Sequence, residues 1–84
     1  MDGQLDMSVH VYPNPTAGRY SIDLKNCGSA DVTIFNALGE VVLSKHINSE
    51  QSHTIEGYLP IGGEYYVTVA TADGTQTTKL VVKR

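Results

Sequence analysis

Residues 63–82 read GEYYVTVATADGTQTTKLVV, two runs rich in β-branched and aromatic residues on either side of Asp73-Gly74. Large apolar side chains recur at every second position, which is the pattern of a strand with one buried face. An Asp-Gly pair between two such runs is a strong signal for a two-residue β-hairpin. The stretch therefore predicts antiparallel strands at about residues 64–72 and 75–83. The side chains that we expect to face the core are Tyr65, Val67, Val69, Leu80 and Val82.

The same period of two recurs upstream and predicts further strands at about residues 7–12, 18–24, 30–35, 40–46 and 52–56. In the second of these, Tyr20, Ile22 and Leu24 should face the core. Asn36 and Gly39 occupy the first and fourth positions of a type I turn between the third and fourth strands. Seven short strands with such turns predict an all-β fold, an immunoglobulin-like antiparallel β-sandwich. The Cys…Trp…Cys framework of true immunoglobulin domains is missing, so this likeness is architectural.

The stretch VYPNPTAG, residues 11–18, interrupts the alternation with two prolines that bracket Asn14. Each proline lacks an N–H and restricts the residue before it to extended conformations. Neither a helix nor a central strand can therefore run through this stretch. We expect a stiff corner that ends an edge strand, with Gly18 turning the chain into the next strand.

The length of 84 residues fits a single domain with one core. Residues 1–8 begin with the polar MDGQLD and are predicted to be a linker stub, and residues 9–84 are predicted to be the domain. The first residues lack the basic start and apolar core of a signal peptide, and no run approaches the length of a membrane span. The net charge of −3, with both signs interspersed, argues against nucleic acid and against direct insertion into a membrane as partners.

Residues that could carry chemistry do not form a recognisable site. His10, His46 and His53 lack metal-ligand spacing, and the single Cys27 can form neither an internal disulfide nor a metal knuckle. No carboxylate pair suggests acid–base work, and no serine lies in a nucleophile elbow. We therefore expect no catalytic residue, no cofactor and no metal, and hence no enzyme. An aromatic platform for sugar is an alternative for three tyrosines, namely Tyr58, Tyr65 and Tyr66, although Tyr65 is better explained as core.

Four segments follow one another along the chain in a distinctive order. They are Val11-Tyr12-Pro13-Asn14-Pro15 with Gly18 close behind, Ile34-Phe35-Asn36-Ala37-Leu38-Gly39-Glu40-Val41-Val42, Gly63-Glu64-Tyr65-Tyr66-Val67, and Lys79-Leu80-Val81-Val82-Lys83. In this order, over about residues 9–84, the chain resembles the C-terminal sorting domain of cargo proteins of the type IX secretion system. The motif positions are expected to be mainly structural: Tyr12, Pro13, Asn14, Pro15, Gly18, Gly39, Gly63 and Tyr65.

The resemblance implies an immunoglobulin-like sandwich at the end of a larger secreted protein. Components of the type IX machinery would be its partners, and a sortase-like cell-surface peptidase would commonly remove it. The cargo would pass through the periplasm to the outer-membrane surface or the extracellular space.

Residues 79–83 are the segment that we expect a partner to read: Lys79, Leu80, Val81, Val82 and Lys83. Leu80 and Val82 should face the core and the other three outward. A strand at a sheet edge also offers unpaired backbone groups to another strand, which leaves self-association open. The alternative function, from a different class, is an accessory immunoglobulin-like or fibronectin-like module that binds carbohydrate or spaces domains.

Overall fold

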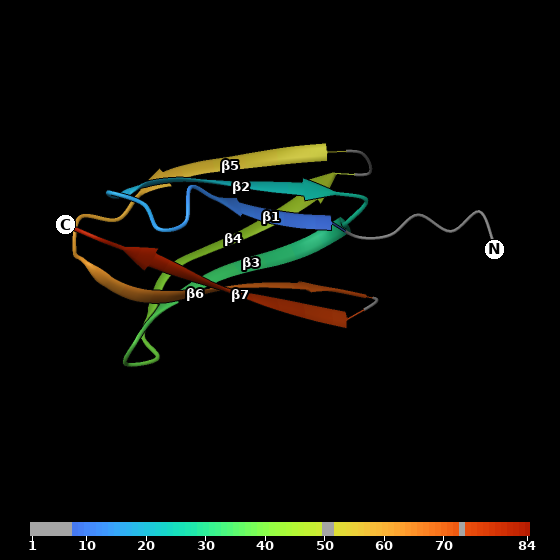
Figure 1. Cartoon of the computed structure of the whole chain (residues 1–84). Helices are drawn as coiled ribbons and strands as arrows, with labels where there is room; N and C mark the ends of the chain where they lie inside the picture. The colour runs from blue at the N-terminus through green and yellow to red at the C-terminus, as the bar shows by residue number, and fades with distance from the viewer. Residues whose placement is uncertain (1–7, 50–51, 73) are drawn as a thin grey trace.

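The chain folds into seven strands in two layers, as a computed structural model shows for residues 8–49, 52–72 and 74–84 (Figure 1). The strands are β1 (Ser8–Tyr12), β2 (Arg19–Lys25), β3 (Gly28–Asn36), β4 (Val41–Ser49), β5 (Ser52–Tyr58), β6 (Gly63–Thr71) and β7 (Gly74–Val82). All seven lie where the alternation predicts them, within a few residues at their ends. Residues 1–7 of the predicted stub lie outside the described residues.

The two layers are a three-stranded sheet in the order β1-β2-β5 and a four-stranded sheet in the order β4-β3-β6-β7. Every neighbouring pair of strands is antiparallel. Consecutive strands repeatedly cross from one sheet to the other, which is the arrangement of immunoglobulin-like sandwiches. The predicted all-β sandwich is therefore confirmed, and β1, β5, β4 and β7 form its sheet edges.

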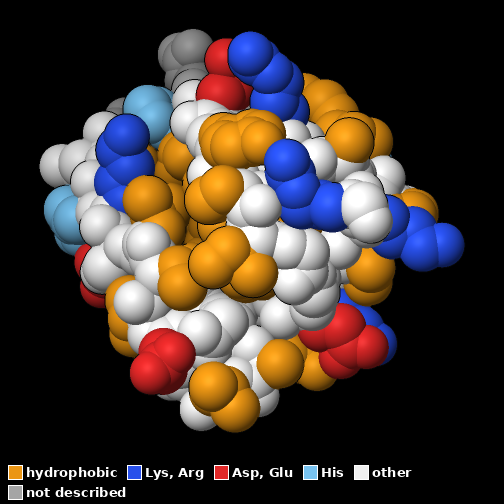
Figure 2. Space-filling view, turned by 90° about the vertical axis from the view of Figure 1, so that its left-hand side faces the viewer, with side chains coloured by type: hydrophobic (Ala, Val, Ile, Leu, Met, Phe, Trp, Pro, Cys, Tyr) orange, Lys and Arg blue, Asp and Glu red, His pale blue; other side chains and the backbone are white. Residues whose placement is uncertain are grey.

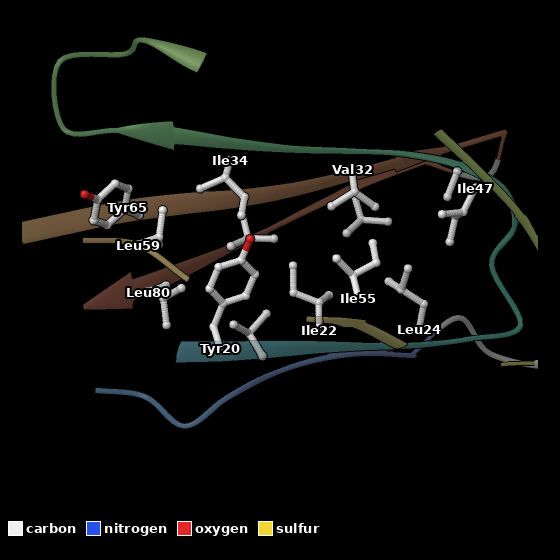
Figure 3. Packing of buried hydrophobic residues seen from close by; sticks show 14 of the residues in the cluster. Tyr20, Ile22, Leu24, Val32, Ile34, Ile47, Ile55, Leu59, Tyr65 and Leu80 are labelled. Carbon is white, nitrogen blue, oxygen red and sulfur yellow. The ribbon is translucent and has the colours of Figure 1, made fainter. Parts of the chain in front are cut away.

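The core fills the space between the two sheets (Figure 3). Tyr20, Ile22 and Leu24 point into it from β2, and Val32 and Ile34 face them from β3. Ile22, Val32 and Ile34 are fully shielded from solvent. The five side chains predicted inward on the hairpin are also buried. Their exposed fractions are 0% for Val69 and Leu80, 1% for Val67, 3% for Val82 and 6% for Tyr65. Burial of each large apolar side chain contributes about 1.5–3 kcal/mol, so this alternation stabilises the sandwich.

The hairpin of β6 and β7 pairs without interruption from Gly63 opposite Val82 to Thr71 opposite Gly74. Asp73, the first residue of the predicted turn pair, lies outside the described residues. At the start of β6 the buried Tyr65 ring sends its hydroxyl back to the carbonyl oxygen of Ile61, at 2.6 Å. This is the geometry of the tyrosine corner of immunoglobulin-like domains, and it fixes the loop that precedes β6.

The predicted turn between β3 and β4 is present and is centred on Asn36. Its carbonyl accepts the N–H of Gly39 at 3.0 Å, and its side-chain Oδ1 accepts the N–H groups of Leu38 and Glu40 at 2.9 and 3.0 Å. Gly39 has a φ of +85°, a left-handed conformation that glycine adopts without steric cost. One asparagine side chain thus satisfies two backbone donors and sets the turn.

Candidate functional site

The segment between β1 and β2 leaves the three-stranded sheet, pairs with the edge of the four-stranded sheet and returns. β1 pairs with β2 as far as Tyr12, opposite Ser21, and there the edge strand ends as expected. Beyond the two prolines, Thr16 forms a parallel bridge with Val82 of β7, in the four-stranded sheet. The Thr16 N–H donates to the Val81 carbonyl at 2.9 Å, and the Lys83 N–H donates to the Thr16 carbonyl at 2.8 Å. The predicted corner is therefore also a strand crossing that covers part of β7.

Asn14 extends this pairing with its side chain. Its Nδ2 donates to the carbonyl of Lys79 at 2.7 Å, and its Oδ1 accepts the N–H of Val81 at 3.0 Å. An amide carries a donor and an acceptor in the same relation as a peptide unit, so Asn14 binds the strand edge much as a neighbouring strand would. An asparagine between the prolines is thus explained by a contact 65 residues away in the sequence.

Thr16 is a buried polar residue, with an exposed fraction of 4%. Its hydroxyl donates to the carbonyl of Arg19 and accepts the N–H of Gly18 at 3.0 Å, which fixes the turn into β2. Gly18 is packed tightly, because a Cβ there would lie 2.6 Å from the Tyr58 ring and 3.2 Å from the Leu59 carbonyl oxygen. Glycine at this position is therefore required by close packing as well as by its φ of +141°.

Arg84 completes the contacts on the other side of the same segment. Its Nη1 donates to the Ala17 carbonyl at 2.9 Å, and its guanidinium carbon lies 5.5 Å from the centre of the Tyr58 ring, over its face. A cation over an aromatic face contributes about 0.5–1 kcal/mol at an exposed site. We call the whole set the edge clasp, with Asn14, Thr16 and Ala17 on one side and Lys79, Val81, Lys83 and Arg84 on the other.

The edge clasp changes what the predicted recognition segment can present. The side chains of Leu80 and Val82 are buried as expected, so only Lys79, Val81 and Lys83 offer side chains outward. The expectation of an unpaired edge is wrong over this half of β7, because the outward backbone groups from the Lys79 carbonyl to the Lys83 N–H bind Asn14 and Thr16. A partner that reads this segment in the folded domain therefore meets side chains and the clasp itself.

The outward lysines differ in their surroundings. Lys79 forms an ion pair with Glu64 of β6, with 3.3 Å between Nζ and Oε2 and about half of each side chain exposed. An exposed pair of this kind contributes about 0–1 kcal/mol. Lys83 is exposed beyond the end of β7. A variant that changes these charges must therefore treat Lys79 together with Glu64.

The end of the sandwich that holds the clasp carries exposed apolar side chains. Figure 2 views this end and shows hydrophobic side chains gathered down its middle, with charged side chains of both signs around them. Leu38, at 84% exposed, and Ile61, at 71%, come from the two loops that meet there, and with Val42 they border a hollow of about 230 Å³. These exposed apolar side chains therefore lie at the same end of the sandwich as the clasp.

Several residues of types that could carry chemistry lie in the described part of the chain. His46 and Asp31 form an exposed cross-strand pair, with 2.7 Å between Nδ1 and Oδ1. Among the described residues, no three histidine, cysteine or acidic side chains gather to hold a metal ion, and no helix has the length and apolar character to cross a membrane. Cys27 is buried at the rim of the core, and burial raises the pKa of its thiol. None of these three residues, His46, Asp31 and Cys27, belongs to the edge clasp.

The strand order and the tyrosine corner place this chain in the class of immunoglobulin-like β-sandwich modules. A family model described as the secretion system C-terminal sorting domain matches residues 10–83. The chain is also 36% identical over 83 residues to an ulvan lyase from Nonlabens ulvanivorans, a match that covers 98% of this chain and 16% of that protein. The chain therefore belongs to the family of type IX secretion C-terminal sorting domains, as its motifs predict. It is a signal for export across the outer membrane to the cell surface or the extracellular space.

Sequence reasoning missed three members of the clasp, namely Thr16, Ala17 and Arg84. A threonine two residues before a glycine is a signal for a hydroxyl-stabilised turn, so Thr16 could have been singled out. Arg84 carries no local signal, because its partners Ala17 and Tyr58 lie far away in the sequence.

Proposed function

We propose that the type IX machinery reads the outward side chains of the clasped half of β7, namely Lys79, Val81 and Lys83. The single observation that supports this is the joining, at one sheet edge, of the two chain segments that carry the Val11–Pro15 and Lys79–Lys83 motifs. The family motif at each end of the domain thereby becomes one continuous surface. Leu80 and Val82 act in this proposal only by holding that surface in place from the core.

We also propose that a sortase-like peptidase removes the domain by cutting in or before the segment that precedes Val9. Peptidases need an extended, unpaired substrate, and cleavage concentrates in such segments. From Ser8 onward the chain is paired in β1, and from Asn14 it is bound to β7. Mass spectrometry of the released domain would give its first residue. A first residue beyond Gly18 would contradict the proposal, because the cut would then remove half of the clasp.

The cargo in this proposal is a larger secreted protein. The ulvan lyase matches this chain over only 16% of its own length, so catalysis belongs in our proposal to another part of such a protein. The sorting domain itself has no catalytic role, no cofactor and no metal. The outward residues act by recognition alone.

The test uses the chain fused to a periplasmic reporter in a strain with a type IX system. The variant is Lys83→Glu combined with Lys79→Gln. Glutamine rather than glutamate is chosen at position 79, because a second carboxylate beside Glu64 would add repulsion that is unrelated to recognition. We expect the fusion to stay folded, since exposed substitutions usually change stability by about 0.5 kcal/mol or less. We expect it to accumulate in the periplasm.

The matched control is Lys25→Glu combined with Lys45→Gln, which changes the charge by the same amount on exposed positions of β2 and β4. This fusion should be secreted normally. If both variants are secreted like the original, or both accumulate, the outward lysines are not what the machinery reads.

A further inference from the structure

The outer face of the three-stranded sheet carries a groove whose lining residues are not among those proposed above to be read by the type IX machinery. Its volume is about 530 Å³, within the range of small-molecule sites. Tyr12 and Pro13 border it from the end of β1, Arg19 and Ser21 from β2, and Glu56 and Tyr58 from β5. The pairing of Ser21 with both Tyr12 and Glu56 places these side chains in a row across the three strands.

The two tyrosines of the groove are exposed but held in place. Tyr12, 38% exposed, donates its hydroxyl to Asp23 Oδ2 at 3.0 Å, and the Asp23 Oδ1 accepts the Thr54 hydroxyl at 2.8 Å. Tyr58, 54% exposed, lies under the Arg84 guanidinium and against Gly18. Two aromatic rings that are fixed before binding cost little ordering entropy when a ligand arrives.

The floor of the groove is equally fixed. Gly57 lies directly opposite Tyr20, and a Cβ at position 57 would be only 2.2 Å from the Tyr20 hydroxyl oxygen. The Tyr20 ring thus fills the space on the core side of Gly57, so the strand pair that carries the groove is packed from behind. A fixed base between two aromatic side chains favours a ligand with a flat face.

The charges of the groove further restrict the chemical class of ligand that fits it. Arg19 and Glu56 contribute one positive and one negative charge, so the lining has no net charge and does not favour a polyanion or a polycation. The guanidinium offers several donors, the carboxylate offers acceptors, and the Ser21 hydroxyl offers both. A sugar ring has an apolar C–H face that packs on an aromatic ring and a hydroxyl rim that needs such donors and acceptors.

We propose that this groove is a binding site for a neutral oligosaccharide, with Tyr12 and Tyr58 against the sugar faces and Arg19 and Glu56 on the hydroxyl groups. A polyproline peptide also packs on aromatic grooves, but its backbone offers only carbonyl acceptors and no donor for Glu56. The mixed donor and acceptor set at the centre of the groove therefore favours the saccharide.

The experiment is an NMR titration of the ¹⁵N-labelled chain with cellotetraose and, separately, maltotetraose at millimolar concentrations. We expect saturable amide shifts at Tyr12, Ser21, Glu56 and Tyr58 with at least one of the two sugars, at a dissociation constant of about 1 mM. Tyr58→Ala should weaken binding about tenfold or more. Glu56→Ala, on an exposed side chain outside the core, should also weaken it, and this variant keeps the test valid if loss of the Tyr58 ring unfolds the domain.

The matched control is Tyr66→Ala, which removes a tyrosine from the four-stranded sheet and should leave sugar binding unchanged. The proposal is overturned if neither sugar gives saturable shifts, or if Tyr58→Ala and Glu56→Ala bind as well as the original chain. Saturable shifts at the same amides with decaproline and with neither sugar would also overturn it, since the groove would then be a peptide site.

Discussion

Replacing Asn14 with alanine isolates the contribution of the edge clasp, because it removes two hydrogen bonds and no buried apolar surface. The lost bonds are those from Nδ2 to the Lys79 carbonyl at 2.7 Å and from the Val81 N–H to Oδ1 at 3.0 Å. A neutral hydrogen bond contributes about 0.5–1.5 kcal/mol net, so two contribute about 1–3 kcal/mol. Both lie at an exposed edge where water can replace the lost partner. We therefore expect Asn14→Ala to lower the free energy of unfolding by about 1–2 kcal/mol.

Thermal unfolding followed by circular dichroism measures this loss. A domain of this length has a total stability of roughly 4–13 kcal/mol, so the change is a sizeable part of it. At about 4–8 °C per kcal/mol for a domain of this size, Tm should fall by about 4–16 °C. Hydrogen exchange gives the local reading, since the amide of Val81 loses its acceptor and should exchange faster.

Asn14→Asp is the matched control. A carboxylate can still accept the Val81 N–H, but it cannot donate to the Lys79 carbonyl and places a second acceptor opposite it. This variant should therefore also melt earlier while the Val81 amide stays protected. If Asn14→Ala leaves both Tm and the exchange of the Val81 amide unchanged, the clasp does not stabilise the domain and the reasoning is refuted.

Three further predictions concern the fold. Tyr65→Phe should lower the free energy of unfolding by about 1–2 kcal/mol, because the hydrogen bond to Ile61 is lost. Tyr65→Ala should lower it by about 3–5 kcal/mol, as a large-to-small change in the core does. Equal urea midpoints for the original and Tyr65→Ala would show that the ring is not buried. Gly39→Ala should cost about 1–2 kcal/mol because of the left-handed φ at that position, and an unchanged Tm would contradict this. Hydrogen bonds from Thr54 and then Tyr12 lower the pKa of Asp23 in the folded domain. Their stabilisation is therefore present above the pKa of the unfolded chain and is lost as the pH falls through the folded pKa. Asp23→Asn should accordingly reduce the fall of stability at acid pH, which urea midpoints measured at several acid pH values would show. A fall as steep as in the original chain would contradict the prediction.

The strands could be predicted from the sequence because the signal for each is local. Alternation places Tyr20, Ile22 and Leu24 on one face whatever the partner strand, and the turn at Asn36 is determined by residues within four positions of it. The tyrosine at position 65 was expected in the core for the same reason. Its hydroxyl bond to Ile61 adds a detail that burial alone does not specify.

The clasp could not be predicted because its contacts join the two ends of the domain. Nothing near Asn14 in the sequence indicates that its amide meets the carbonyl of Lys79, and a proline corner is fully explained by local backbone preferences. The same limit applied to β7, where an edge position suggested unpaired backbone groups. Whether such groups are paired depends on a chain crossing from the other sheet, which only the three-dimensional arrangement shows.

The clasp also determines which experiments can separate recognition from folding. Removing residues 79–84 would delete the buried Leu80 and Val82 together with the groups on that side of the clasp that bind Asn14, Thr16 and Ala17. A chain shortened in this way loses core, edge pairing and outward surface at once, so its failure to be secreted would not identify a signal. Outward substitutions at Lys83 keep the core intact, and Asn14→Ala weakens the clasp while leaving every outward side chain of β7 in place. If the Lys83 substitution abolishes secretion and Asn14→Ala does not, the machinery reads side chains on β7. If Asn14→Ala abolishes secretion in a chain that is still folded, the machinery depends on the edge clasp.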